Sequence, residues 1–150
     1  MYLISACLLG KKCKYNGESN YDSNTVEFSK RVDYVEACPE ELGGLPTPRV
    51  PCEIVGSRVV SKDGTDCTEE FLLGAKNTLE IAKERGVTKA ILKSKSPSCG
   101  IYEIYDGTFS GVLKIGRGIT ADILEQNGID LYSERDMELL SKNFKSRSYI

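Results

Sequence analysis

Short blocks of apolar residues alternate with polar segments along the chain, and the spacing within each block indicates its secondary structure. Short blocks that are apolar almost throughout are typical of strands buried on both faces of a parallel sheet. Such blocks predict strands at 2–6, 33–37, 87–92 and 129–132. Each block is bounded by polar or glycine-containing segments, which are typical of surface connections.

Helical spacing is clearest in the segment that begins at Thr68. Thr68 with Glu69 and Glu70 provides an amino-terminal cap and an acidic first turn. Apolar residues then recur three and four positions apart until Arg85-Gly86, where glycine ends the pattern. Shorter patterns of the same kind predict helices at 25–31, 118–126 and 134–144.

Two other segments predict hairpins, and one predicts an irregular loop. Residues 54–61 have glycine and serine at their centre, and residues 102–109 have Asp106-Gly107 as a turn. Residues 38–51 contain four prolines and two glycines, a density that predicts a fixed loop without regular structure. Helices that precede strands are typical of a parallel sheet. The sequence therefore predicts an α/β fold, a single Rossmann-like three-layer domain over 1–150 with a mostly parallel central sheet.

The composition is that of an ordinary globular protein and excludes several functional classes. Hydrophobic residues make up 40% and charged residues 28% of the chain, and 20 basic against 22 acidic residues give a formal charge of −2. This balance provides no strong nucleic-acid signal. Because no long apolar run is present and Met1 leads straight into a strand, we expect no membrane span, no signal peptide and a cytoplasmic location.

Six cysteines and no histidine narrow the possible chemistry further. In a reducing compartment, cysteines serve as metal ligands, catalytic thiols or small core residues more often than as disulfides. The absence of histidine excludes a Cys–His dyad and every zinc site that uses imidazole. Chemistry in this chain must therefore use thiolates, carboxylates, hydroxyls, lysines or a bound cofactor.

Three of the cysteines, Cys7, Cys38 and Cys99, each follow a predicted strand. The carboxyl ends of parallel strands lie along one edge of a sheet, so these thiols are expected to converge there. Three convergent thiolates would suit a soft metal or an iron–sulfur cluster. The alternative is that they are small buried hydrophobic residues. Cys13 is either a fourth ligand or a spectator. We expect Cys52 and Cys67 to serve packing and to lie away from this edge of the sheet.

Polar residues beside these cysteines are candidates for proton transfer. Glu40 lies two residues after Cys38, and Ser96 and Ser98 flank Pro97 just before Cys99. Without histidine, a carboxylate is the natural general acid or base. The alternative is that Glu40 is an ordinary surface charge and that Ser98 only shapes its own loop. The cations at positions 49, 93 and 95 suit either an anionic substrate or solvent.

The ordered motifs of the chain resemble the thiouracil desulfurase family, which was long catalogued as a domain of unknown function. The resemblance covers residues 2 to about 134. The motifs that carry it are Cys7-Leu8-Leu9-Gly10, Cys13-Lys14-Tyr15-Asn16-Gly17, Cys38-Pro39-Glu40, Gly43 to Arg49, Gly64 to Thr68, Leu92 to Gly100 and Tyr105 to Gly111.

This resemblance implies a [4Fe-4S] cluster held by Cys7, Cys38 and Cys99, with the fourth iron open to the sulfur of a small thiolated nucleobase. Water would then replace that sulfur without a net redox change. The family also uses an acidic residue and a serine. Glu40 matches the first, and Ser98, or alternatively Ser96, matches the second. Asp66 is a third candidate. An exposed iron is easily lost in air, so aerobically prepared protein is expected to be depleted of the cluster.

Two other functions compete with desulfuration. One is a non-catalytic protein that binds a metal or carries sulfur through its cysteines. The other is a thiol-redox protein, which the absence of a Cys-x-x-Cys pair argues against. Anaerobic purification separates these possibilities, because an iron–sulfur protein is brown and a structural zinc protein is colourless.

Overall fold

The core of the protein is a four-stranded sheet in which every strand runs parallel to its neighbours. The structure is a computed structural model that describes residues 1–140. The sheet has the order β2-β1-β5-β8. Its strands are β1 (Tyr2–Ser5), β2 (Tyr34–Ala37), β5 (Lys89–Leu92) and β8 (Asp130–Ser133). All four predicted strands are confirmed, each within two residues at either end.

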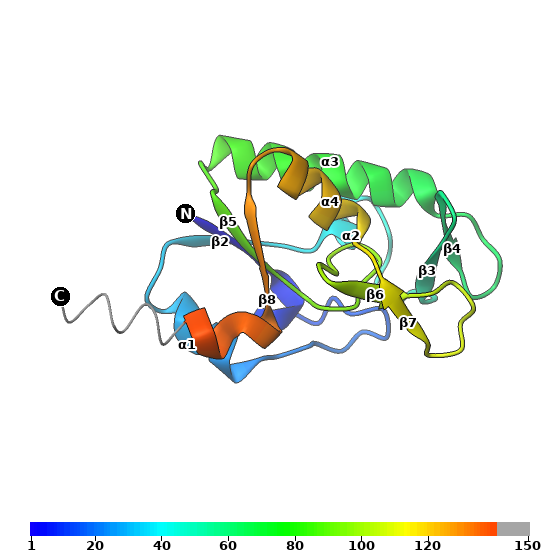
Figure 1. The fold of residues 1–150 in the computed structure, drawn as a ribbon, viewed down its shortest axis with the longest axis horizontal. Coiled ribbons are helices and arrows are strands. Elements are labelled where there is room, and N and C mark those ends of the chain that lie inside the picture. The colour runs from blue at the N-terminus through cyan, green and yellow to red at the C-terminus, as the bar shows by residue number, and fades with distance from the viewer. Residues whose placement is uncertain (141–150) are drawn as a thin grey trace.

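Alternate residues of the central strands supply two separate hydrophobic cores, which explains the continuous apolar runs in the sequence. On one face, Leu3 and Leu92 pack with residues of α3 (Thr68–Glu84) and α4 (Ile119–Gln126). On the other face, Ile4 and Ile91 pack against Phe28 of α1 (Ser23–Ser29) and against residues near the end of the described chain. Figure 1 shows α3 and α4 on one side of the sheet and α1 on the other, which confirms the predicted three-layer α/β architecture.

The helix predictions hold with small shifts at the ends. The helices predicted from position 68 and over 118–126 are confirmed, and α1 begins two residues before its predicted start at 25. The predicted helix over 134–144 opens as the 3-10 helix η2 (Glu134–Asp136), whose capping box joins Ser133 and Asp136. Helical residues 137–140 follow, and the remainder of this prediction lies outside the described residues. Across residues 1–140, no helix combines the length and apolarity that a bilayer crossing requires.

The proline-rich segment 38–51 was predicted to lack regular structure, and this prediction is wrong at its start. Residues Pro39–Leu42 form a short helix, α2. Proline suits the first helical position because the missing N–H has no partner to lose there. Two acidic residues in the first turn stabilise the helix by interacting with the positive end of its dipole. The remainder of the segment, which contains a cis Thr47–Pro48 bond, is irregular as predicted.

The two small hairpins differ in how well the sequence anticipated them. Strands β3 (Cys52–Val55) and β4 (Arg58–Ser61) pair around residues 56–57 as predicted. The second hairpin pairs β6 (Glu103–Tyr105) with β7 (Leu113–Ile115), so its connection runs over 106–112 and not through a tight turn at 106–107. The reason is that the backbone N–H groups of Gly107 and Phe109 donate to Glu53 on β3, which draws the connection across to the neighbouring hairpin.

Two glycines allow α2 to lie directly against α3. A Cβ added at Gly74 would overlap the carbonyl oxygen of Pro39, and one added at Gly43 would overlap that of Glu70. We therefore expect Gly74→Ala to destabilise the protein by about 1–3 kcal/mol, the usual cost of overpacking. Helix propensity alone predicts the opposite sign, since alanine is favoured over glycine within a helix by about 1 kcal/mol. Urea unfolding measures the sign, with Lys76→Ala on the exposed side of α3 as the control, and a stabilised Gly74→Ala would contradict this packing argument.

Candidate functional site

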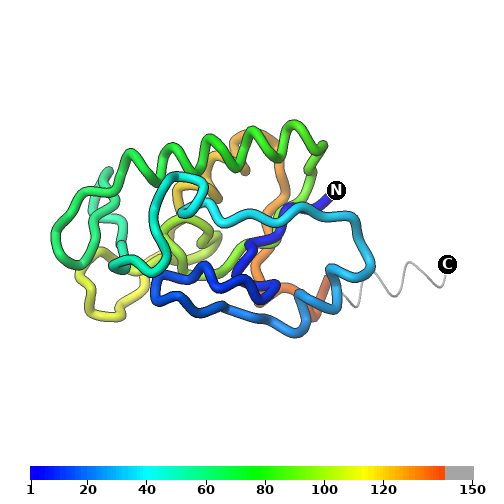
Figure 2. The backbone as a smooth tube through the Cα atoms, turned by 180° about the vertical axis from the view of Figure 1, so that it is seen from behind, coloured from blue at the N-terminus to red at the C-terminus, as the bar shows by residue number. Residues whose placement is uncertain are grey.

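A cavity of about 480 Å³ opens at the carboxyl ends of β2, β1 and β5. From β1 the chain proceeds first to β2 on one side and later to β5 on the other. A parallel sheet places its ligand site where the strand order reverses in this way. Figure 2 shows the loops that follow β1 and β2 meeting at this end of the molecule, where the Arg49 N–H donates to the carbonyl of Tyr15 at 2.7 Å.

The three cysteines that follow strands all line this cavity. Cys7 lies in the 3-10 helix η1 (Ala6–Leu9), directly after β1. Cys38 directly follows β2 and precedes α2, and Cys99 lies in the loop after β5. Because β1 is hydrogen-bonded to both β2 and β5, the three thiols come from adjacent strand ends. The predicted convergence on one edge of the sheet is therefore present.

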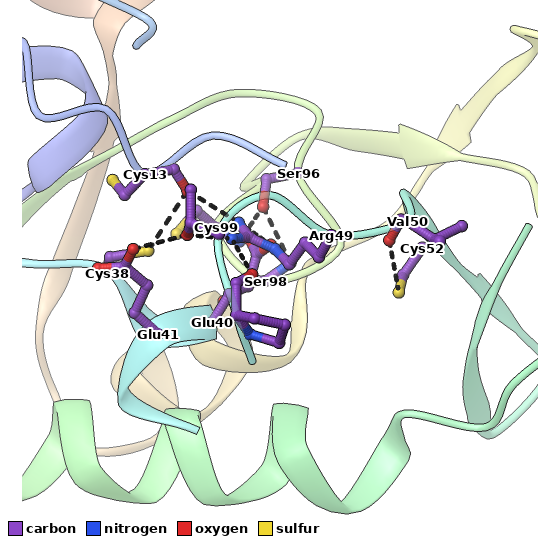
Figure 3. A network of polar contacts seen from close by, with 12 residues as sticks. Cys13, Cys38, Glu40, Glu41, Arg49, Val50, Cys52, Ser96, Ser98 and Cys99 are labelled. Atoms are coloured by element: carbon purple, nitrogen blue, oxygen red, sulfur yellow. Dashed lines mark hydrogen bonds and ion pairs between the residues drawn. The ribbon is translucent and has the colours of Figure 1, made fainter. Parts of the chain in front are cut away.

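Cys13 also lines the cavity and is buried between two of these thiols. A hydrogen bond from Cys13 lowers the pKa of Cys38 to about 7, against the opposing effect of burial. Hydrogen bonding from Cys13 likewise lowers the pKa of Cys7, whereas the pKa of Cys13 itself is raised. Cys13 therefore remains a thiol, and its single hydrogen stabilises one neighbouring thiolate at a time, at Cys7 or at Cys38. Figure 3 shows Cys13, Cys38 and Cys99 grouped together, with Cys52 apart from them.

Cys52 and Cys67 behave differently from this group. Cys52 lines the far part of the cavity, contrary to the expectation that it lies away from the site. Burial raises the pKa of Cys52 to about 12, and burial also raises the pKa of Cys67, which directly precedes α3. Both pack into the apolar cluster between α3 and the small hairpins, which agrees with a packing role.

The loop that carries Cys99 is fixed by its serines and glycines. The Ser96 Oγ accepts the backbone N–H groups of Ser98 and Cys99, both at 3.0 Å. A Cβ at Gly118 would overlap the Ser98 carbonyl group, so α4 approaches this loop as closely as backbone allows. The Ser5 Oγ donates to the Cys99 Sγ at 3.6 Å, and burial raises the pKa of the Cys99 thiol.

The structure separates the two serines between which the sequence left the choice open. Ser96 lines the cavity. Ser98 is 1% exposed and does not line it, because its Oγ lies 3.0 Å from the Thr120 Oγ1 and its carbonyl accepts from the start of α4. Asp66 is also remote, since it pairs with Arg58 at 2.7 Å and accepts the Thr68 N–H at the start of α3. Of the three candidates, only Ser96 is brought to the thiols.

Glu40 reaches the cavity and is held there by Arg49. The Glu40 Oε2 accepts two bonds from the guanidinium, from Nε at 2.9 Å and from Nη2 at 2.6 Å. The same Nη2 donates to the Cys13 carbonyl at 3.0 Å, and the Arg49 side chain is only 7% exposed. Arg49 therefore joins the proline-rich loop, α2 and the Cys13 loop. From the sequence, Arg49 was expected to bind an anionic substrate or to face solvent. Its pairing with Glu40 was missed because sequence patterns do not show which residues meet across an irregular loop.

The thiols that line the cavity do not form a ready-made site for a single metal ion. Within residues 1–140, no three histidine, cysteine, aspartate or glutamate side chains form a group that could hold one. The ligands of an iron–sulfur cluster stand farther apart, because several metal and sulfide ions separate them. A soft donor set on three adjacent strand ends, facing one cavity, fits a cluster better than an ion.

Comparison with known proteins decides the family. The model of the 2-thiouracil desulfurase family matches residues 2–136. The chain belongs to the 2-thiouracil desulfurase family. It is 42% identical over 147 residues to the uncharacterized protein YbbK of Bacillus subtilis (strain 168), which covers 91% of this chain and 97% of YbbK. The chain also resembles the solved structure of TudS, a [4Fe-4S]-dependent thiouracil desulfidase, with a TM-score of 0.88 and 38% sequence identity. This match covers 96% of this chain and 97% of TudS.

Membership in this family confirms the resemblance seen in the sequence motifs, and the TudS comparison confirms the predicted fold. The matched region contains every cysteine of the chain. It also contains Glu40, Ser96 and Arg49, so the whole cavity wall described above lies within the family match.

Proposed function

We propose that this chain is an iron–sulfur-dependent desulfurase that hydrolyses the carbon–sulfur bond of a small thiolated nucleobase, such as a thiouracil. The observation that carries the proposal is the convergence of three thiols from adjacent parallel strands on one cavity that also contains Glu40 and Ser96. Family membership supports the same reaction. The reaction replaces C=S by C=O, with water supplying the oxygen and its two protons leaving with the sulfur, so no electron donor or acceptor is needed.

Cys7, Cys38 and Cys99 are the proposed ligands of a [4Fe-4S] cluster, which three cysteines hold with one iron left free of protein ligands. When bound, the cluster supplies a Lewis-acidic iron for the sulfur of the substrate. Hydrogen bonding from Cys13 favours the thiolate forms of Cys7 and Cys38, which are the forms that bind iron. Cys13 is in this view a donor to the ligands and not a ligand itself.

Glu40 is proposed to move protons between the attacking water and the departing sulfur. Arg49 occupies the Glu40 Oε2 with two hydrogen bonds, whereas the Oε1 accepts none from any side chain in residues 1–140. The carboxylate is therefore fixed in orientation and presents one oxygen that is free for water. A carboxylate in this position is the natural proton carrier in a chain without histidine.

Ser96 is proposed to orient the substrate by donating a hydrogen bond. Its Oγ already accepts two backbone N–H groups, from Ser98 and Cys99, which use the two lone pairs of the hydroxyl. The hydroxyl hydrogen therefore remains available for an acceptor atom in the cavity that Ser96 lines. A carbonyl oxygen or a ring nitrogen of the base provides such an acceptor.

A sulfide-release assay on anaerobically reconstituted protein tests this function. We expect a brown protein that converts one or more members of a panel of thiolated bases and nucleosides into sulfide and the corresponding oxo compound in equal amounts. Protein with a full complement of iron that releases no sulfide from any compound would favour the non-catalytic sulfur carrier. A colourless, zinc-containing protein would favour a structural metal site.

Ser5→Ala is expected to change the reduction potential of the cluster while iron content is retained. The Ser5 hydroxyl donates to the Cys99 sulfur, and hydrogen bonds to cluster sulfurs raise the potential by stabilising the more reduced, more negative state. Loss of the bond should therefore lower the potential. A redox titration followed by electron paramagnetic resonance measures this, with Ser94→Ala as the control, because Ser94 lines the same cavity without a hydrogen bond to a cysteine. Equal potentials in both variants would remove Ser5 from this role.

A further inference from the structure

The connection between β6 and β7 forms a wall of the cavity that the proposed chemistry does not use. Tyr105, Phe109 and Gly111 line the same cavity as the thiols. Figure 1 shows the β6–β7 hairpin beside the β3–β4 hairpin, at the end of the molecule away from α1. The segment 105–111 is also one of the sequence motifs of the chain, and no proton transfer or cluster binding has been assigned to it.

Glu53 on β3 holds this connection in place. The Glu53 Oε1 accepts the backbone N–H of Gly107 at 3.0 Å and that of Phe109 at 3.1 Å. The connection also lies directly on β3, since a Cβ at Gly107 would stand 2.8 Å from the Ile54 carbonyl oxygen. Within the loop, Asp106 accepts both the N–H and the hydroxyl of Thr108. The backbone around Phe109 is thus fixed from both sides.

Phe109 adopts a conformation that is costly for an aromatic residue. Its φ is +56°, in the left-handed region where bulky side chains are rare. Such strain persists only where surrounding contacts impose it, and it is found often at ligand sites. Packing in the protein core does not account for it, because none of the hydrophobic core clusters in residues 1–140 includes Phe109. The ring is half-buried and lines the cavity instead.

We propose that Phe109 is the stacking surface for the planar ring of the substrate, and that Glu53 is the positioning residue that holds Phe109 at the cavity. This inference rests on the proposed function for the identity of the ligand, a thiolated pyrimidine. Aromatic side chains stack on every base because each base has a π-face, so the strength of this contact depends on the ring and not on the sulfur. Phe109 should therefore bind the oxo product as well as the thiolated substrate.

Binding of 2-thiouracil and uracil to the reconstituted holoenzyme tests the stacking role. Phe109→Ala should raise the dissociation constants of both ligands by about tenfold, within the range measured for base–aromatic stacking. Iron content should stay at the wild-type level, because Phe109 is not among the hydrogen-bond partners of the cysteines. Val112→Ala is the matched control, since Val112 belongs to the same connection, is 53% exposed and does not line the cavity. Wild-type affinities in Phe109→Ala would overturn the proposal.

A double-mutant cycle tests the positioning role of Glu53. Glu53→Ala should weaken binding of both ligands about as much as Phe109→Ala and raise KM with little change in kcat. Glu53→Gln should restore most of the affinity, because the amide oxygen still accepts the two N–H groups. The double alanine variant should be no weaker than Phe109→Ala alone, since both changes remove one contact. Additive losses would refute the positioning role and leave the stacking role standing.

The same measurements separate this inference from the proposed function. If the wild-type protein releases no sulfide but Phe109→Ala still loses uracil affinity, the proposed function fails and the stacking role is supported. If the wild type releases sulfide normally and Phe109→Ala has the same KM as the wild type, the stacking role fails and the proposed function stands.

Discussion

Replacing Cys7, Cys38 or Cys99 by alanine is expected to abolish both cluster content and sulfide release. Each of these cysteines lies at the end of a different strand, so no neighbouring thiol on the same loop replaces Cys38 or Cys99. A cluster held by three thiolates loses a third of its protein ligands in each variant. Iron and sulfide analysis together with the visible absorption spectrum measure the first effect, and the sulfide-release assay measures the second.

The other three cysteines provide matched controls. Cys67→Ala and Cys52→Ala should keep the full iron content, because these thiols belong to the apolar cluster around α3 and burial keeps them protonated. Cys13→Ala should also keep the cluster, because Cys13 is proposed as a hydrogen-bond donor to the ligands and not as a ligand. Loss of iron from Cys13→Ala would assign a fourth cysteine ligand, leave no iron for the substrate and contradict the proposed mechanism.

Glu40→Gln is expected to lower turnover by about 10²–10⁴-fold, the usual contribution of a general acid or base. The cluster should remain, because a proton carrier does not hold iron. Glutamine is the informative replacement, since its amide oxygen still accepts from Arg49, whereas alanine would leave a buried guanidinium without its partner. Steady-state kinetics of sulfide release, normalised to iron content, measure the effect.

Glu41→Gln is the control for this prediction. Glu41 is the next residue along α2, yet it bonds to Thr47 and Lys11 and does not line the cavity. Its replacement should leave turnover near the wild-type value. Wild-type turnover in Glu40→Gln with intact iron would remove Glu40 from the mechanism.

The sheet and the meeting point of the cysteines were predictable because both depend on local patterns. Short apolar runs identify buried strands, and the geometry of a parallel sheet then brings the residues that follow β1, β2 and β5 to one edge. The position of Cys7, Cys38 and Cys99 in sequence was therefore enough to place them in space. No spacing rule was needed beyond the strands themselves.

The details that the sequence did not predict depend on contacts between distant residues. The β6–β7 connection is long because Glu53, on another hairpin, accepts its N–H groups. The close packing of α2 on α3 depends on Gly74 of α3, which leaves room for the Pro39 carbonyl. The choice between Ser96 and Ser98 depends on which of the two side chains the loop turns towards α4. The sequence could not decide between them, because both residues flank the same proline.

The three thiols follow three different strands, and this affects how the protein acquires its cluster. A zinc finger chelates its metal through neighbouring cysteines and folds around it, whereas Ser5 and Cys99, which touch across this site, are 94 residues apart in sequence. An unfolded chain therefore holds no chelate, and the hydrophobic cores on both faces of the sheet must form first. We therefore expect iron to enter the folded protein, and protein that has lost its cluster to oxygen to accept a new one without refolding.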